Sequence, residues 1–286
     1  MASRRDLRRR VKSIKNTAQI TKAMQMVAAS RMRRAQTRVA ESRPYSEHIR
    51  EIVADVAGRS GAETHPLLVQ REVQNVEIVV VTPNRGLAGA LVTNVNREVV
   101  RLRGTISQPI RTVAVGRKGR DFAIRTRMNL ISEFTELGDQ PGAGDIRGVA
   151  QQVLGDYEDG ECDVVYLVYT EFITTLRQKP KTVQLLPVLP PESESPVRGP
   201  WSYEPDNPGL VLSQLLPRYV EFTIYQAVLE SIASEHSARM IAMSNATENA
   251  LDLVKDLTLL MNKARQAEIT KEISEISGAA EALRTG

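Results

Sequence analysis

The sequence predicts a mixed α and β protein: a long antiparallel two-helix coiled coil, with a small α/β domain inserted between its two helices. Three observations predict this fold class. Apolar and small residues recur at alternating spacings of three and four along residues 1–58 and again along 208–286. Strand-like and helix-like segments alternate between residues 75 and 190. The chain has 286 residues, which is enough to bury a sizeable core.

The first segment, residues 1–58, carries a heptad seam on which no charged residue falls. Pro44 interrupts the pattern and is expected to bend or kink the helix. The seam residues are Leu7, Val11, Ile14, Ala18, Thr21, Gln25, Ala28, Met32, Ala35 and Val39.

The last segment, residues 208–286, shows the same alternation from Leu212 to Ala264, and no proline follows Pro217. A helix of roughly 75 residues would be ~110 Å long, which indicates a coiled coil with a left-handed supercoil. Only these two segments carry the pattern, and they flank everything else, so we expect them to pair antiparallel. The C-terminal helix is the longer one, so part of it should project alone or rest against other chains.

The middle of the chain, residues 75–190, predicts a small and partly parallel sheet with helices on its faces, a Rossmann-like arrangement. Residues 190–208 are rich in Pro, Ser and Glu and are expected to form a loop. The expected strands are 76–82, 110–115, 129–134, 162–169 and 182–189, and the expected helices are 87–102, 117–127 and 145–157.

The sequence gives no sign of a catalytic, cofactor or metal site. Cys162 is the only cysteine, so it cannot form an internal disulfide or a cysteine-based zinc site, and we interpret it as a small buried hydrophobe. The histidines share no metal-like spacing, and no nucleophile motif is present. They are His48, His65 and His236.

The turn at residues 82–90 contains Gly86 and Gly89 and follows an expected strand, where glycines can cradle a phosphate. It matches neither the dinucleotide-binding pattern nor the Walker pattern. The glycines are more simply explained by a tight turn and close helix packing.

No apolar run approaches the ~20 residues needed to span a bilayer, and no signal peptide is evident. Any connection to a membrane is therefore expected to come through partners.

Residues 1–38 hold twelve Lys and Arg residues against a single acid, Asp6. This charge could form a nucleic-acid-binding helix, the solvated outer face of a coiled coil, or a surface for an acidic protein partner. The residues alone leave nucleic acid and a protein partner equally open.

Several long stretches resemble the gamma subunits of F-type ATP synthases, and they occur in the family's order over the whole chain. The block 262–280 fits the family's C-terminal signature of Ile-Thr, two Glu and Gly-Ala. Asn84 stands where the family usually has an acid before the arginine. The matching stretches are 16–32, 42–45, 84–89, 201–205, 237–243 and 262–280.

The resemblance implies a central rotor shaft that couples rotation of an ion-driven c-ring to ATP synthesis, or to hydrolysis in reverse. The implied partners are the alpha and beta subunits of the hexameric head, the epsilon subunit and the c-ring. The shaft would be a non-catalytic subunit, one copy per complex, with Mg-ATP and ADP bound by alpha and beta. It would lie peripherally at the cytoplasmic face of the cell membrane.

The resemblance also implies partner contacts residue by residue. Contacts to the beta subunit are expected from Arg265, Gln266, Thr270, Glu272 and Glu275 and from the neighbouring patch Lys22, Met24 and Met26. Contacts to the epsilon subunit and the c-ring are expected from Tyr203 and Glu204.

Two rival hypotheses come from other classes of protein. A basic coiled coil that binds nucleic acid would show steep salt dependence, but the basic segment lacks interleaved aromatic residues. A small α/β enzyme with helical dimerisation arms would bind a ligand at the Gly86–Gly89 turn, but no catalytic constellation accompanies that turn.

Overall fold

The computed structural model describes residues 4–60, 65–189 and 208–285, and its long helices are α1 (Arg4–Ser60) and α5 (Pro208–Thr285). The chain forms two compact units. Unit 1 comprises residues 1–27 with 240–286, and unit 2 comprises residues 28–239. The sequence pattern divides the chain differently, into the consecutive segments 1–58, 75–190 and 208–286. That division stays a prediction.

In unit 1, α1 and α5 pair antiparallel, as expected. Three side-chain contacts join them, with numbers rising along one helix as they fall along the other. Arg4 forms an ion pair with Glu268 (3.7 Å), the Thr21 and Thr247 hydroxyls are hydrogen-bonded (2.8 Å), and Gln25 Nε2 donates to Ser244 Oγ (3.2 Å). The predicted seam residues Leu7, Ala18, Met243, Thr247 and Ala250 are buried here.

In unit 2, the remaining parts of α1 and α5 also pair antiparallel. Ala35 and Val39 pack in one buried cluster with Leu229 and Ala233. The rings of Tyr45 and Phe222 lie 4.4 Å apart between centroids. Small residues at the seam let the two helix backbones approach closely, as the sequence pattern indicated.

Unit 2 also contains a five-stranded sheet in the order β3-β2-β1-β4-β5. The first four strands in sequence run parallel, and β5 returns antiparallel to β4. This is the expected partly parallel sheet. The strands are β1 (Val76–Val81), β2 (Ile110–Val115), β3 (Asn129–Phe134), β4 (Val164–Phe172) and β5 (Gln178–Leu186).

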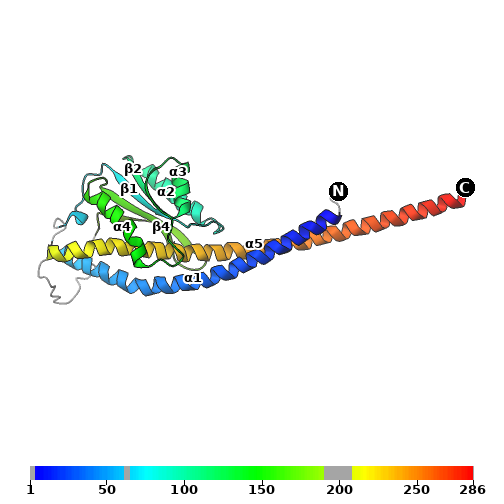
Figure 1. The fold of residues 1–286 in the computed structure, drawn as a ribbon, viewed down its shortest axis with the longest axis horizontal. Coiled ribbons are helices and arrows are strands. Elements are labelled where there is room, and N and C mark those ends of the chain that lie inside the picture. Colours follow the sequence, from blue (N-terminus) through cyan, green and yellow to red (C-terminus); the bar gives the residue numbers. More distant parts are fainter. Residues whose placement is uncertain (1–3, 61–64, 190–207, 286) are drawn as a thin grey trace. The chain divides into compact units, whose positions relative to one another are not determined.

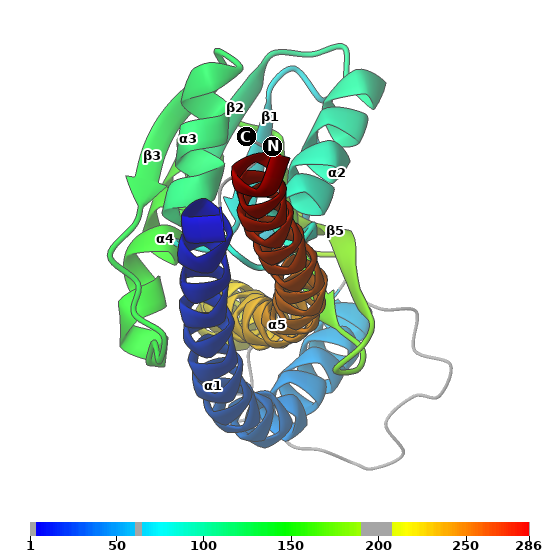
Figure 2. The ribbon, with the colours of Figure 1, turned by 90° about the vertical axis from the view of Figure 1, so that its right-hand side faces the viewer.

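Helices cover both faces of this sheet (Figures 1 and 2). Helices α2 (Leu91–Thr105) and α3 (Arg117–Arg125) pack on one face, where Val95 and Val99 join the even-numbered residues of β1 in a buried cluster. Helix α4 (Ala143–Glu158) and the first part of α5 pack on the other face. A short 3-10 helix, η2 (Pro66–Leu68), adds two buried leucines to that second core.

Several expected boundaries differ from the structure by a few residues, and the two largest differences, at the starts of a helix and a strand, have local reasons. The helix expected from residue 87 begins at Leu91, because Leu87 and Gly89 adopt positive φ angles of 63° and 58° and form a turn instead. The strand expected from residue 182 begins at Gln178, despite Pro180. A proline is tolerated there because β5 is an edge strand, with one side free of ladder hydrogen bonds.

None of the helices over the described ranges combines the length and apolarity needed to cross a bilayer.

Candidate functional site

The structure places all eight residues expected to contact the beta subunit in unit 1. Lys22, Met24 and Met26 lie on α1, and the other five lie on α5. Tyr203 and Glu204, expected to contact epsilon and the c-ring, lie outside the described residues.

One member of the α1 group, Lys22, is linked to the neighbouring helix through Gln25. The Lys22 ammonium donates to Gln25 Oε1 (3.3 Å), and the Gln25 amide in turn donates to Ser244 on α5 (3.2 Å). Met24 is half-buried, whereas Met26 is 60% exposed. The group therefore presents one cation and one apolar side chain to solvent from a fixed backbone.

The α5 group is fully exposed. From Arg265 to the end of the signature block at Ala280, every described side chain is exposed. Among the described residues, the ion pair of Arg4 with Glu268 is the last one that joins this stretch to α1. The remaining polar contacts stay within α5, where Lys271 pairs with Glu275 (3.6 Å).

The structure does not bring the α1 and α5 groups side by side, although the sequence resemblance implied neighbouring patches. Lys22 follows Thr21, which contacts Thr247, whereas Arg265 lies near the level of Arg4. Eighteen residues of α1 separate Lys22 from Arg4, which corresponds to roughly 27 Å of helix. The predicted contact surface therefore consists of two separate groups of residues, which lie at different positions along the helix axis.

An apolar stripe lies among the residues of the α5 group, and it was not predicted from the sequence. Ile269, Ile273 and Ile276 are 47%, 58% and 70% exposed. Their spacing of four and three places them on one face of the helix. These isoleucines do not occupy the heptad positions of the predicted seam, which runs to Ala264. Their i, i+4, i+7 spacing is the sequence signal that indicates a second apolar face of the helix.

The basic segment of α1 is mostly unneutralised within the chain. Arg9 pairs with Asp6 (3.3 Å), and Arg31 pairs with Asp139 on the loop before α4. Among the described residues, six other cations of this segment are exposed and make no ion pair or side-chain hydrogen bond. They are Arg5, Arg8, Arg10, Lys12, Lys15 and Arg33. Such a surface favours contact with an acidic partner.

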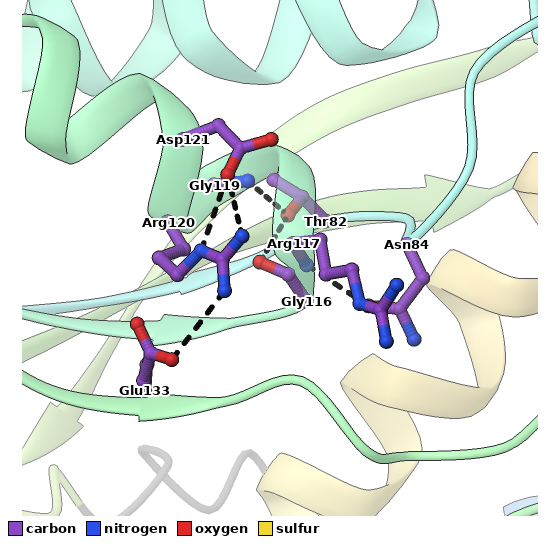
Figure 3. Close-up of polar contacts among 8 residues, drawn as sticks. All are labelled: Thr82, Asn84, Gly116, Arg117, Gly119, Arg120, Asp121 and Glu133. Carbon is purple, nitrogen blue, oxygen red and sulfur yellow. Dashed lines mark hydrogen bonds and ion pairs between the residues drawn. The ribbon is translucent and has the colours of Figure 1, made fainter.

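The turn after β1, where this fold class often binds a ligand, is hydrogen-bonded to the start of α3 (Figure 3). A cavity of about 440 Å³ opens beside it. The first amides of α3, which could bind an anion, are already taken. The amide of Arg117 donates to Asn84 Oδ1 (2.9 Å), that of Lys118 to the Pro83 carbonyl (3.1 Å), and that of Gly119 to Thr82 Oγ1 (2.7 Å).

Gly116, which lies between β2 and α3, has a structural role beside this turn. Its φ is 98°, and a Cβ added there would lie 1.9 Å from the Thr82 carbonyl oxygen. The glycine lets the ends of β1 and β2 approach closely.

Several titratable groups are buried in unit 2. Burial, followed by the negative charge of Asp156, raises the pKa of Glu77 to about 8. Burial lowers the pKa of His236 to about 4, so this seam histidine is neutral at pH 7. Cys162 is a buried free thiol, and burial raises its pKa. Over the described part of the chain, no three His, Cys, Asp or Glu side chains are placed to hold a metal ion.

Comparisons with known proteins agree over nearly the whole chain. A model of the ATP synthase family matches residues 3–283. The ATP synthase gamma chain of Chloroflexus aurantiacus is 52% identical over 289 residues, and that of Roseiflexus castenholzii is 49% identical over 288 residues, each with 99% of both chains covered. In fold, the chain is similar to a chain from the rotor of Euglena gracilis mitochondrial ATP synthase (TM-score 0.68, 20% identity, 93% of this chain and 98% of that one).

Proposed function

The chain belongs to the family of ATP synthase gamma chains, and on that premise we propose that it is the central shaft of a rotary ATP synthase. The observation that carries this proposal is the bare α5 segment beyond the Arg4–Glu268 contact. It presents Ile269, Ile273 and Ile276 together with charged residues to solvent. A helix with such a surface needs other chains around it.

The shaft acts on ATP chemistry without a catalytic site of its own. Mg-ATP and ADP bind to the alpha and beta subunits of the surrounding head, and the shaft selects among conformations of the beta subunits. A ligand or partner shifts such an equilibrium only by contacting one state better than another. Arg265, Gln266, Thr270, Glu272 and Glu275 supply these contacts at one level of the helix pair, and Lys22, Met24 and Met26 at the other. The uneven distribution of these side chains around the helix pair makes the contacts change with rotation.

The basic face of α1 contributes an electrostatic attraction to acidic loops of the head. Exposed ion pairs in water are weak, typically below about 1 kcal/mol each, and are easily exchanged. Such contacts hold the shaft within the head while allowing it to turn. This role accounts for the cations of α1 better than nucleic-acid binding does, since the family assignment covers the whole chain.

The shaft is connected to the membrane through its partners. Epsilon and the c-ring bind the shaft through Tyr203 and Glu204, and ion flow through the membrane turns the c-ring and shaft together. The bacterial relatives support a position at the cytoplasmic face of the cell membrane. The α/β domain serves as the attachment, rather than as an enzyme.

A rotation assay tests this proposal. The chain is assembled with cognate alpha and beta subunits, and a bead is attached to a Ser107→Cys variant at an exposed turn of unit 2. The single native thiol, Cys162, is buried, so the label goes to the new site. We expect ATP to drive rotation in one direction in three-fold steps. If the chain does not join the head, or ATP turnover is indifferent to its presence, the shaft proposal is wrong.

A further inference from the structure

We propose that unit 2 carries a binding site for a small organic anion, in a cavity at the edge of the sheet where β2 and β3 begin. The cavity has a volume of about 390 Å³, within the range of small-molecule sites. It lies between the end of α2, the start of β2 and the turn that joins α3 to β3. The inference is independent of the proposed shaft function, since no residue of unit 1 takes part.

Two cations at the rim are available for a ligand. Arg103 is in the last turn of α2, and Arg127 is the second residue after the end of α3. Both are exposed, and neither guanidinium forms a hydrogen bond or ion pair with any described residue. Guanidinium groups match the planar geometry of carboxylate and phosphate oxygens and bind them in pairs of hydrogen bonds.

The floor of the cavity contains an unsatisfied hydroxyl. Thr112 on β2 is 1% exposed, and its Oγ1 has no hydrogen-bond partner among the described residues. A buried polar group without a partner is unfavourable and calls for an explanation. If the Thr112 side chain rotates so that its hydroxyl faces the cavity, a ligand oxygen would supply the missing partner.

The backbone at Arg127 supports the same conclusion. Its φ is 52°, in the left-handed region, and Met128 donates to the Ala123 carbonyl (2.9 Å) to close the end of α3. Glycine and asparagine are favoured at this position because they adopt positive φ with little strain. Cations are favoured near helix C-termini, which would explain the charges of Arg103 and Arg127 but not the strained backbone or the unpaired Thr112 hydroxyl.

The rest of the lining defines the class of ligand. Ile110 and Met128 belong to the apolar cluster under α2 and α3 and give the cavity one apolar wall. Asn129 adds an amide at the rim. We therefore expect an oxyanion attached to a compact apolar group, with the anion between the two arginines and the apolar part on Ile110 and Met128.

Calorimetric titration of the full chain at low salt tests the site with three probes: inorganic phosphate, phenyl phosphate and benzoate. Low salt is needed because ionic strength screens exposed charges. We expect saturable binding at one site per chain, tighter for phenyl phosphate than for inorganic phosphate. Comparison of phenyl phosphate with benzoate then tells whether the natural anion is a phosphate ester or a carboxylate.

Three variants separate a ligand site from ordinary structure. Arg103→Ala and Arg127→Gly should each weaken binding by about tenfold or more, and Thr112→Val by about fivefold. Arg127→Gly should also raise the melting temperature of the free protein, because glycine relieves the strained φ. Arg125→Ala removes a cation from the same helix outside the cavity and should leave binding unchanged. The proposal is wrong if none of the probes binds saturably, or if Arg103→Ala and Arg127→Gly bind as tightly as the wild-type chain.

Discussion

At the scale of single residues, Glu77 shows what burial of a carboxyl group costs in this sheet. Its side chain is 0% exposed on β1, and neither carboxyl oxygen has a hydrogen-bond partner among the described residues. The nearby Arg111 is occupied by Asp156 (3.0 Å) and Glu161 (2.6 Å). Glu77 is therefore held in its protonated form, with a pKa of about 8 in the folded protein against 4.5 ordinarily.

This pKa predicts a pH-dependent stability. The folded chain binds more protons than the unfolded chain between pH 4.5 and about 8. The contribution of Glu77 is thus fully present below pH 4.5 and is lost as the pH rises through about 8. Glu77→Gln should remove this dependence and increase the free energy of unfolding at pH 9 by several kcal/mol, on the order of 3–5. Urea unfolding at pH 6 and pH 9 measures it.

Glu158→Gln is the matched control for Glu77→Gln, because Glu158 is exposed on the neighbouring helix α4. It should change the free energy of unfolding by less than about 0.5 kcal/mol at either pH. Equal slopes of stability against pH for wild type and Glu77→Gln would contradict the buried-carboxyl account.

Gly116 gives a second prediction at this scale. In Gly116→Ala, the added methyl group would meet the Thr82 carbonyl, and the φ of 98° would be strained as well. We expect a loss of at least about 3 kcal/mol in the free energy of unfolding. Gly104→Ala, in α2 with open space around it, should instead stabilise the chain by up to about 1 kcal/mol. Thermal unfolding of both variants distinguishes them, and similar melting temperatures would refute the close-approach role.

At the scale of elements, the seam between α1 and α5 depends on small residues. Ala233 is fully buried against Ala35 and Val39 in unit 2. Ala233→Leu should force the helices apart and lower the free energy of unfolding by about 1–3 kcal/mol. Ala40→Leu, on the exposed side of α1, adds the same volume where nothing opposes it. Chemical unfolding compares the two, and a neutral Ala233→Leu would show that the seam has spare volume.

Much of the fold could be predicted from periodicity. The apolar residues of the two seams recur over many helical turns, and those of the strands form runs of several residues. The misplaced elements depend on single residues whose conformation the pattern does not reveal. Leu87 adopts a positive φ that is uncommon for its residue type, and Pro180 sits in an edge strand. Glu77 was missed because a charge between Val76 and Ile78 looks like ordinary alternation of buried and exposed residues.

At the scale of the whole molecule, the candidate site is a surface for other chains. Substitutions in it should therefore reduce the activity of the complex without changing the stability of the free chain. Arg265→Ala combined with Gln266→Ala removes two exposed side chains that make no hydrogen bond or ion pair among the described residues. We expect an unchanged melting temperature and at least a tenfold loss of ATP hydrolysis by the assembled complex, or failure to assemble.

Glu248→Ala combined with Asn249→Ala is the control for that prediction, since both residues are exposed on α5 outside the predicted contacts. It should leave hydrolysis within about twofold of wild type, as surface changes usually do little. If both double variants behave alike, the predicted contacts with the beta subunit are wrong.

The candidate site could be located only through resemblance, for a physical reason. Arg265 is exposed and makes no hydrogen bond or ion pair among the described residues, so neither periodicity nor burial distinguishes it from its neighbours. The spacing of Ile269, Ile273 and Ile276 was the one intrinsic signal, because exposed apolar residues on one helix face are unfavourable in water.

The edge strand β5 has a consequence for the chain before it meets any partner. An open sheet edge offers unpaired amides and carbonyls to strands of other molecules and so invites aggregation. Here Pro180 lacks an amide hydrogen, and Lys179 adds an exposed positive charge beside it. A newly made copy is thereby protected from joining this edge of its sheet to another copy, and it remains available for assembly into its complex.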